Sequence, residues 1–408
     1  MGAAAPAAPP NSAIASGGEG IVAVENYKDE ISDMTDQRPT RGPTVIDLFA
    51  GCGGMTQGFV NLGFRPVLAV ESSMAAAATY AVNFGERHVF CGDIADLPDG
   101  SVPEADAVIG GPPCQGFSNL GTRDPDDPRN RLWREYMRVV AQARPKVFVM
   151  ENVERFRSSH ELGLLGEEIA SGALQDYSMT AAILNAADFG VSQRRRRAVV
   201  VASRIGRPEL PAPRHSKDGR SGPPWRTVRD AIGDIPHETR STKLPDSDVE
   251  VFDRAVPGVF KAQDLHLGRS PRPLSLQRYD CIPPGGGRFD LPRELMPDCW
   301  RNKATGTTDV MGRMRWDAPS LTIRTEFFKP EKGQYLHPEW AATDPESRVN
   351  RPITHWEAAR LQGFADNYLW CGKKTEIARQ IGNAVPVGLA EAIAAGVLAR
   401  LDSAMVAA

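Results

Sequence analysis

One cysteine stands where a chain could hold a nucleophile: Cys114, in the segment GGPPCQGFS. An apolar run, ADAVI, comes shortly before it, and the two prolines next to the cysteine restrict the backbone. A thiolate is strongly nucleophilic and is also a competent leaving group. The segment therefore indicates either a small core residue that ends a strand or a nucleophile held on a stiff loop.

A glycine-rich segment, IDLFAGCGGMTQGF, could hold a cofactor. Gly51, Gly53 and Gly54 fall where a predicted strand meets a predicted helix, so the backbone can approach a ligand closely. Glu71 ends the next predicted strand about 20 residues later, where a carboxylate can accept hydrogen bonds from both hydroxyls of a ribose. Taken alone, this pattern also fits a dinucleotide-binding oxidoreductase, or a tight turn without a ligand.

A second carboxylate, Asp93 in CGDI, ends the following predicted strand. It could accept a hydrogen bond from an adenine amino group, or it could cap the start of a short helix. Ligands of open parallel sheets bind beyond the carboxyl ends of the strands. We therefore expect four residues that end predicted strands to converge on one crevice: Phe49, Glu71, Asp93 and Cys114.

The elements that would position these residues alternate regularly from Thr44 onward. Short β-branched runs such as TVIDLF, PVLAV, ADAVIG and KVFVME are separated by helical patterns, and two more strands fit YSMTAAIL and RAVVVAS. This alternation predicts βαβ units around a mostly parallel sheet, which is an α/β fold of the Rossmann-like type. From Ser203 to about Asn350, Pro, Gly, Arg and Asp interrupt the pattern, which favours a second, smaller, loop-rich domain.

The predicted domain limits follow these changes in the sequence. Helical periodicity returns in ITHWEAARLQGF, where we expect Trp356 in the core and His355 on the surface, with no catalytic role for either. A last amphipathic pattern, GLAEAIAAGVLARL, is expected to pack on the first domain. The predicted parts are a disordered tail at 1–43, a first domain at 44–203 with 376–408, a second domain at 204–350, and a connecting helical region at 351–375.

The net charge of −3 is unevenly distributed along the chain. The stretch from Arg194 to Pro330 holds 26 Lys and Arg against 17 Asp and Glu, a net of +9. Such a block fits a face that contacts phosphates, or an ordinary solvated surface. The six cysteines form no CxxC pair and no His/Cys metal spacing. With no signal sequence and no apolar run of membrane length, we expect a reduced, intracellular protein without a metal or a membrane role.

Further motifs follow in order: ENV, QRRRR, EAARLQGF and QIGNAVPV. Together with DLFAGCGG and GGPPCQGFS, they make the chain resemble the DNA (cytosine-5)-methyltransferases of the bacterial type, from Val45 to about Ala395 apart from the target-reading segment. The resemblance implies the fold of class I methyltransferases, which use S-adenosyl-L-methionine. It also implies that the second domain recognises the target sequence and that duplex DNA is the partner.

The resemblance implies roles for the motif residues. Cys114 would add to C6 of cytosine, because C5 alone is a poor nucleophile toward a sulfonium methyl group. Glu151 would supply a proton or a strong hydrogen bond at N3, where electron density accumulates. The motif positions place Arg195 and Arg197 near O2 and the nearby backbone, and the carbonyl of Pro112 near the 4-amino group.

The resemblance also implies which residues hold the cofactor and the DNA. Asn383, in the last motif, would return to the cofactor crevice. The target cytosine must leave the duplex, since a stacked base offers neither face to such a site. The predicted cofactor contacts are Phe49, Gly51, Gly53, Gly54, Glu71, Asp93 and Asn383, and the predicted substrate contacts are Pro112, Gln115, Ser118 and Gln193.

Alternatives to this interpretation remain open from the sequence. A tRNA cytosine-5 methyltransferase would share the fold and the chemistry, although the long second domain disfavours it. A catalytically silent, methyltransferase-like DNA-binding protein predicts loss of the catalytic residues, all of which are present. A nicotinamide oxidoreductase fits the glycine loop alone. For the leading interpretation we expect a monomer in the cytoplasm, associated with the nucleoid, and a cognate restriction endonuclease is a candidate partner.

Overall fold

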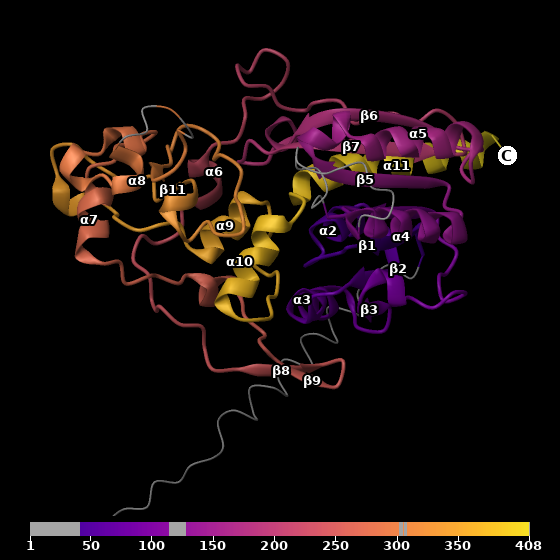
Figure 1. The fold of residues 1–408 in the computed structure, drawn as a ribbon, viewed down its shortest axis with the longest axis horizontal. Coiled ribbons are helices and arrows are strands. Elements are labelled where there is room, and N and C mark those ends of the chain that lie inside the picture. The colour runs from indigo at the N-terminus through magenta and orange to yellow at the C-terminus, as the bar shows by residue number, and fades with distance from the viewer. Residues whose placement is uncertain (1–40, 114–127, 302–304, 306–307, 408) are drawn as a thin grey trace, which may run out of the picture.

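A seven-stranded sheet forms the centre of one half of the molecule (Figure 1). The structure is a computed structural model and describes residues 41–113, 128–301, 305 and 308–407. The predicted tail therefore lies outside the described residues up to position 40. In the spatial order of the sheet, the strands are β3 (Val89–Cys91), β2 (Arg65–Glu71), β1 (Thr44–Leu48), β4 (Ala107–Gly110), β5 (Val147–Val153), β7 (Arg196–Ser203) and β6 (Ser178–Asn185).

The sheet is parallel from β3 to β5, and β7 runs antiparallel to both of its neighbours. Only residues 186–195 join β6 to β7, which is too short for a crossover, so the two strands form a hairpin. This explains why a mostly parallel sheet ends in an antiparallel edge. The helices that cover the sheet are α2 (Gly54–Val60), α3 (Met74–Phe84), α4 (Pro128–Ala143), α5 (His160–Ser171) and α11 (Val387–Ala407).

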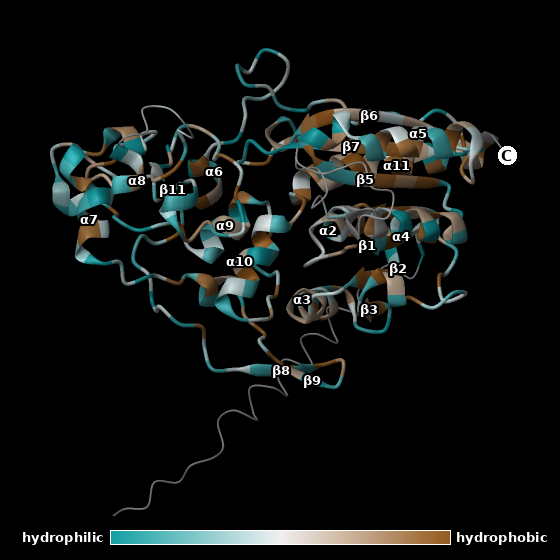
Figure 2. Cartoon of the chain, viewed as in Figure 1, coloured by the Kyte–Doolittle hydropathy of each residue, from teal (hydrophilic) through white to brown (hydrophobic). Residues whose placement is uncertain are grey.

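Both faces of the sheet are buried. Along β1, Ile46 and Leu48 pack into an apolar cluster with α4 and α5, whereas Val45 packs into a cluster with α2 and α11. Strands buried on both faces have nearly continuous apolar sequences, as β1, β4 and β5 do. Figure 2 shows the hydrophobic residues along the strands and α11. The Rossmann-like α/β fold predicted from the sequence is confirmed.

The other half of the molecule is built from short elements joined by loops (Figure 1). Its helices and strands are α6 (Val228–Ile232), β8 (Asp248–Val251), β9 (Arg254–Pro257), α7 (Pro273–Asp280), α8 (Asp298–Arg301), β10 (Gly312–Arg313), β11 (Gln334–Leu336), α9 (His355–Leu361) and α10 (Lys374–Asn383). In the part of the chain that the structure describes, the 3₁₀ helices are η1 (Ile94–Asp96), η2 (Glu154–Ser158), η3 (Ala186–Phe189), η4 (Ala262–Leu265), η5 (Arg288–Asp290), η6 (Arg293–Leu295), η7 (Pro330–Lys332) and η8 (Pro345–Ser347).

One apolar cluster joins the two halves. Tyr80 and Phe84 of α3 share it with Phe327, Tyr335 and Trp370 from the loop-rich half. The hairpin β8–β9 also reaches across, because its apolar side chains pack with those of α3 in a further cluster. The predicted domain limits at residues 203 and 350 therefore do not separate two independent hydrophobic cores. Among the described residues no single helix is long and apolar enough to cross a membrane, and only the bent pair α10–α11 meets that test of length and composition together.

His355 departs from its predicted place on the surface. It is 1 % exposed, and its ring stacks on Phe328 and meets the edge of Phe327. Its Nε2 lies 2.9 Å from the carbonyl oxygen of Lys374, so this nitrogen donates a hydrogen bond between α9 and α10. The prediction was wrong because the aromatic partners come from a distant loop, about which helical periodicity carries no information.

The buried imidazole makes folding depend on pH. Burial, with the charge of Lys374 as a smaller cause, lowers the pKa of His355 to about 3. In the unfolded chain a histidine binds its proton near pH 6.5, so between these values only the unfolded state is protonated. The stability from this group is present above about pH 6.5 and is lost as the pH falls, by about 2 kcal/mol on reaching pH 5.

We therefore expect His355→Gln to flatten the dependence of the free energy of unfolding on pH between about pH 6.5 and 5. Glutamine can still donate to the carbonyl of Lys374 but does not titrate. Urea unfolding at several pH values measures the slope, and His160→Gln, at an exposed position, is the matched control. An unchanged slope in His355→Gln would show that folding does not shift the pKa of this imidazole.

Candidate active site

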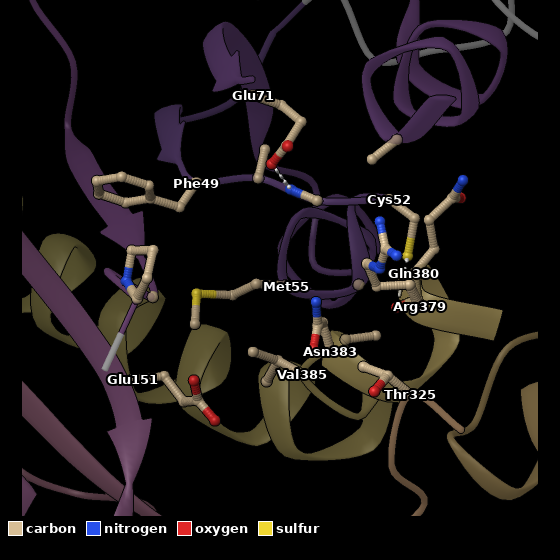
Figure 3. A pocket seen from close by; sticks show the side chains of 18 of the residues that line it. Phe49, Cys52, Met55, Glu71, Glu151, Thr325, Arg379, Gln380, Asn383 and Val385 are labelled. Atoms are coloured by element: carbon tan, nitrogen blue, oxygen red, sulfur yellow. Dashed lines mark hydrogen bonds between the residues drawn. The ribbon is translucent and has the colours of Figure 1, made fainter. Parts of the chain in front are cut away.

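A cavity of about 570 Å³ opens at the carboxyl ends of the parallel strands. One wall is formed by the loop after β1 and by the ends of β2, β4 and β5, and the opposite wall by residues 322–325 and the end of α10. Figure 3 shows Phe49 and Glu71 entering it from one side and Asn383 from the other. The cavity lies where open α/β sheets bind their ligands.

The glycine loop and Glu71 form one hydrogen-bonded unit. The amide of Gly51 donates to Oε2 of Glu71 at 2.9 Å, and the amide of Ser73 donates to Oε1 at 2.7 Å. Gly53 has a φ of +85°, and a Cβ there would lie 2.3 Å from the ring of Phe84. Glycine is therefore required at this position by both conformation and space. These two hydrogen bonds from backbone amides fix the direction in which the carboxylate of Glu71 faces the cavity.

Three other predicted cofactor residues also line the cavity, and two do not. Phe49 follows β1 with a φ of +60°, a rare conformation for a residue with a side chain, and lies against the cavity with Gly54 and Asn383. Gly53 lies behind the loop, outside the cavity lining. Asp93 is exposed and accepts the amide of Ala95 at 2.9 Å, as the cap of η1. Of its two predicted roles, the structure shows the cap.

Asp47, at the end of β1, is a buried carboxylate that sequence reasoning did not single out. It is 1 % exposed, and its Oδ2 accepts a hydrogen bond from the hydroxyl of Thr56 at 2.5 Å. Burial is the main cause that raises the pKa of Asp47 to about 7, and the nearby charge of Glu71 raises it further. An acid that gains a proton near neutral pH therefore lies in the wall of the cavity.

Glu151 and Arg197 form an ion pair at the other end of the cavity. The Nε atom of Arg197 lies 2.9 Å from Oε1 of Glu151, and both side chains are largely buried. They meet because β5 and β7 are antiparallel neighbours, with Arg197 opposite Val153 and Glu151 opposite Val199. The predicted acid and one of the two predicted arginines are thus brought together.

The second predicted arginine, Arg195, is used differently. Its guanidinium donates to the carbonyl oxygens of Ile323 at 3.0 Å, Gly382 at 3.1 Å and Asn383 at 3.4 Å. It is 3 % exposed, and this burial lowers its pKa to about 9. These contacts differ from the predicted contact with the base: Arg195 fastens the loop at 322–325 to the end of α10, and the two segments form one wall of the cavity.

Gln193 also differs from its predicted contact with the substrate. It is fully buried, and its amide nitrogen donates to Oε1 of Gln362 at 2.9 Å and to the carbonyl of Leu361 at 3.2 Å. Its Oε1 accepts the amide of Ile323 at 2.9 Å. These bonds support residues 322–325 from behind and leave the side chain no direction toward the cavity.

The loop that leads to Cys114 begins in the cavity wall. Pro112 and Pro113 line the cavity. The side-chain nitrogen of Asn152, Nδ2, donates to the backbone carbonyl of Pro112 at 3.0 Å. A carbonyl has two lone pairs, so the oxygen of Pro112 can accept a second hydrogen bond. Asn152 was not among the predicted site residues, although its motif, ENV, was. Cys114, Gln115 and Ser118 lie outside the described residues.

A cationic cleft of about 870 Å³, here called the arginine cleft, adjoins this end of the cavity. The two share Arg197, Val153 and Thr322. Arg196 is paired with Glu154 through two hydrogen bonds, at 2.8 and 3.0 Å. The arginines that line the cleft are Arg155, Arg157, Arg194, Arg196 and Arg197.

The family follows from comparison with known proteins. A model of the C-5 cytosine-specific DNA methylase family matches residues 43–399. The chain belongs to this family. It is a DNA (cytosine-5)-methyltransferase, and the family and the fold imply S-adenosyl-L-methionine as the methyl donor.

Relatives of similar length support the assignment. The type II methyltransferase M1.HphI of Haemophilus parahaemolyticus is 35 % identical over 366 residues, which are 87 % of this chain and 86 % of the relative. The type II methyltransferase M.DdeI of Desulfomicrobium norvegicum is 32 % identical, over 86 % and 87 % of the two chains.

Solved structures show the same fold. A protein assigned as a DNA modification methyltransferase, encoded within an E. coli prophage, superposes with a TM-score of 0.63 at 24 % identity, over 88 % of this chain and all of the other. The S. pombe Dnmt2 methyltransferase superposes with a TM-score of 0.53 at 18 % identity, over 88 % and 100 %.

Proposed function

We propose that this enzyme transfers a methyl group from S-adenosyl-L-methionine to C5 of a flipped-out cytosine in a specific duplex DNA sequence, through a covalent bond between Cys114 and C6. The observation that carries the proposal is that a single cavity holds both halves of the reaction. Glu71 and the glycine loop lie at one end, and the Glu151–Arg197 pair lies at the other.

The described residues fit the proposed methyl donor. Glu71 is held by two amides, and the remaining lone pairs of its carboxylate can accept the two ribose hydroxyls. The ring of Phe49 offers an apolar surface beside it, and Asn383 faces the cavity from α10. When bound, the donor supplies an electrophilic methyl group. The chain supplies the rest: it orients the cytosine ring, activates C5 and moves protons.

The chemistry at the base begins with a bond from the sulfur of Cys114 to C6. The electron pair of the C5–C6 double bond moves toward C4, and that of the C4–N3 bond moves onto N3, where the carboxyl group of Glu151 delivers a proton. C5 is then the nucleophilic carbon of an enamine. After methyl transfer, a water molecule accepts the C5 proton and the C5–C6 double bond re-forms as the thiolate leaves C6. N3 returns its proton to Glu151, which restores the neutral aromatic ring.

Arg197 and Pro112 would position the base for these steps. The guanidinium of Arg197 holds Glu151 through Nε, its Nη1 donates to the carbonyl of Arg196 at 2.8 Å, and its Nη2 can approach O2 of the ring. The free lone pair of the Pro112 carbonyl can accept the 4-amino group, while Asn152 holds the carbonyl in place. We assign Arg195 a role only in positioning the cavity wall, because it donates its hydrogen bonds to backbone carbonyls.

The arginine cleft supports a path for the DNA backbone beside the flipped base. Several cations of the +9 block are paired with acids, among them Arg324 with Asp309 and Arg315 with Asp317. Arg155, Arg157 and Arg194, in contrast, have no ion pair within the described residues. Unpaired guanidinium groups next to the cavity are suited to phosphates.

We expect the double variant Arg155→Gln, Arg157→Gln to weaken DNA binding and to reduce the slope of log affinity against log salt by about 2. Titrations of labelled duplex at several salt concentrations measure both quantities. Arg144→Gln is the matched control, since Arg144 is exposed and precedes β5, at the opposite edge of the sheet. A slope equal to that of the wild type would exclude the arginine cleft from the DNA interface.

The function itself is tested by methyl incorporation into duplex DNA and into tRNA. We expect incorporation into duplex DNA only, and bisulfite sequencing of DNA from a methylation-free host that expresses the chain should show one short sequence. Methylation of tRNA alone would contradict the proposal. The type II relatives support the further proposal of a partner restriction endonuclease, and we also propose a monomer that acts on nucleoid DNA in the cytoplasm.

A further inference from the structure

Four arginines line the cavity, and three of them are already engaged. Arg195 donates to backbone carbonyls, and Arg197 is paired with Glu151. Arg324 lies 2.9 Å from the carboxylate of Asp309 and also donates to the carbonyl of Lys332 at 3.0 Å. The fourth, Arg379, is exposed and has no hydrogen bond or ion pair to any residue that the structure describes.

The position of Arg379 relates it to one end of the cavity. It precedes Asn383 by four residues on α10, so the two side chains lie on the same face of the helix. Figure 3 shows Arg379 beside Cys52 and Gln380, across the cavity from Phe49. An acid one turn earlier, Glu376, also lines the cavity. Its Oε2 accepts the amide of Lys373 at 2.7 Å, and the structure has no ion pair between Glu376 and Arg379.

S-adenosyl-L-methionine has a charge pattern that matches this arrangement. The ribose hydroxyls fit Glu71, and Phe49 lies on the same side of the cavity, which leaves the methionine part to extend toward Cys52 and α10. That part ends in a carboxylate and an ammonium group. A guanidinium binds a carboxylate through two parallel hydrogen bonds, which a single ammonium group cannot reproduce.

We propose that Arg379 binds the carboxylate of the methionine part of S-adenosyl-L-methionine, an assignment that rests on the function proposed above. Arg379 is then a cofactor-binding residue, and it fixes how far the donor extends from Glu71. This contact sets the distance between the methyl group and the base end of the cavity. Arg379 therefore recognises the methionine part of the ligand and not its adenosine part.

The test compares ligands with and without the carboxylate on the full chain in the absence of DNA. We expect Arg379→Met to weaken binding of S-adenosyl-L-methionine and S-adenosylhomocysteine by about tenfold or more. Binding of 5′-methylthioadenosine, which has no carboxylate, should change less than about twofold. Arg379→Lys should recover part of the loss, because lysine keeps the charge without the planar fork. Titration calorimetry measures all three affinities.

Arg65→Met is the matched control, because it removes the same charge from an exposed position at the start of β2, outside the cavity lining. We expect it to keep the cofactor affinity of the wild type. Equal losses of affinity in Arg379→Met and in the control variant would mean that the overall charge of the protein, and not one contact, affects binding. Equal losses for all three ligands would mean that the substitution changed the shape of the cavity. Either result would overturn the proposal. An unchanged cofactor affinity with weaker DNA binding would assign Arg379 to a phosphate instead.

The proposal and the function on which it rests fail in different ways. If the wild-type chain binds S-adenosyl-L-methionine and Arg379→Met binds it equally well, only the assignment of Arg379 is wrong. If the wild-type chain binds none of the three ligands while it binds duplex DNA, both are wrong.

Discussion

Replacing Cys114 with alanine is expected to abolish methyl transfer, with a fall in kcat of more than about 10³-fold. Duplex DNA with 5-fluorocytosine at the target should trap the wild-type enzyme, because fluorine cannot leave as a proton does and the thiolate then remains bound to C6. The alanine variant should form no such complex, yet it should still bind the cofactor and DNA, since neither interaction needs the sulfur. A denaturing gel with labelled duplex measures the complex.

Cys299→Ala is the matched control, because Cys299 is a free, exposed cysteine of the same chain. It should form the trapped complex as the wild type does. A persistent complex in Cys114→Ala would identify another nucleophile and would refute the role proposed for the segment GGPPCQGFS.

Glu151→Gln is expected to lower kcat by about 10²- to 10³-fold with little change in the affinity for DNA. The amide keeps the shape of the side chain but can neither deliver a proton to N3 nor pair with the charge of Arg197. Single-turnover methylation together with DNA titrations separates the loss of chemistry from a loss of binding.

Glu154→Gln provides the control for this substitution, three residues along the chain. Its carboxylate is paired with Arg196 in the arginine cleft and lies outside the cavity lining. We expect it to keep single-turnover methylation within about threefold of the wild type. If both glutamine variants lost the same activity, the effect would come from the charge of the region and not from a proton at N3.

The parts of the site that local motifs build could be predicted from the sequence. Strand, glycine turn and helix place Gly51 at the end of β1, and the next strand brings Glu71 to the same edge, because parallel strands share their carboxyl ends. Glu151 was predicted only through the resemblance to the family, because a carboxylate late in an apolar strand could equally cap the following helix.

The parts that depend on distant packing could not be predicted. In QRRRR, Arg195 and Arg197 have the same spacing as any alternate pair, and only the carbonyls of Ile323 and Gly382 decide which of the two is buried. The hydrogen bonds of Gln193 could not be predicted for the same reason, since its partners lie at the end of α9 and in the loop at 322–325. Arg379 could have been found earlier, because it stands one helical turn before Asn383.

The apolar cluster that joins the two halves has a consequence for attempts to change which DNA sequence is methylated. Exchanging residues 204–350 for the corresponding segment of another enzyme would remove Phe327 and Tyr335 from the apolar cluster that they share with Tyr80 and Phe84. The incoming segment would have to match a surface shaped by α3, including the area covered by the hairpin β8–β9. Chimaeras that exchange this segment, which the sequence predicts to read the target, should therefore take both sides of that interface from one parent.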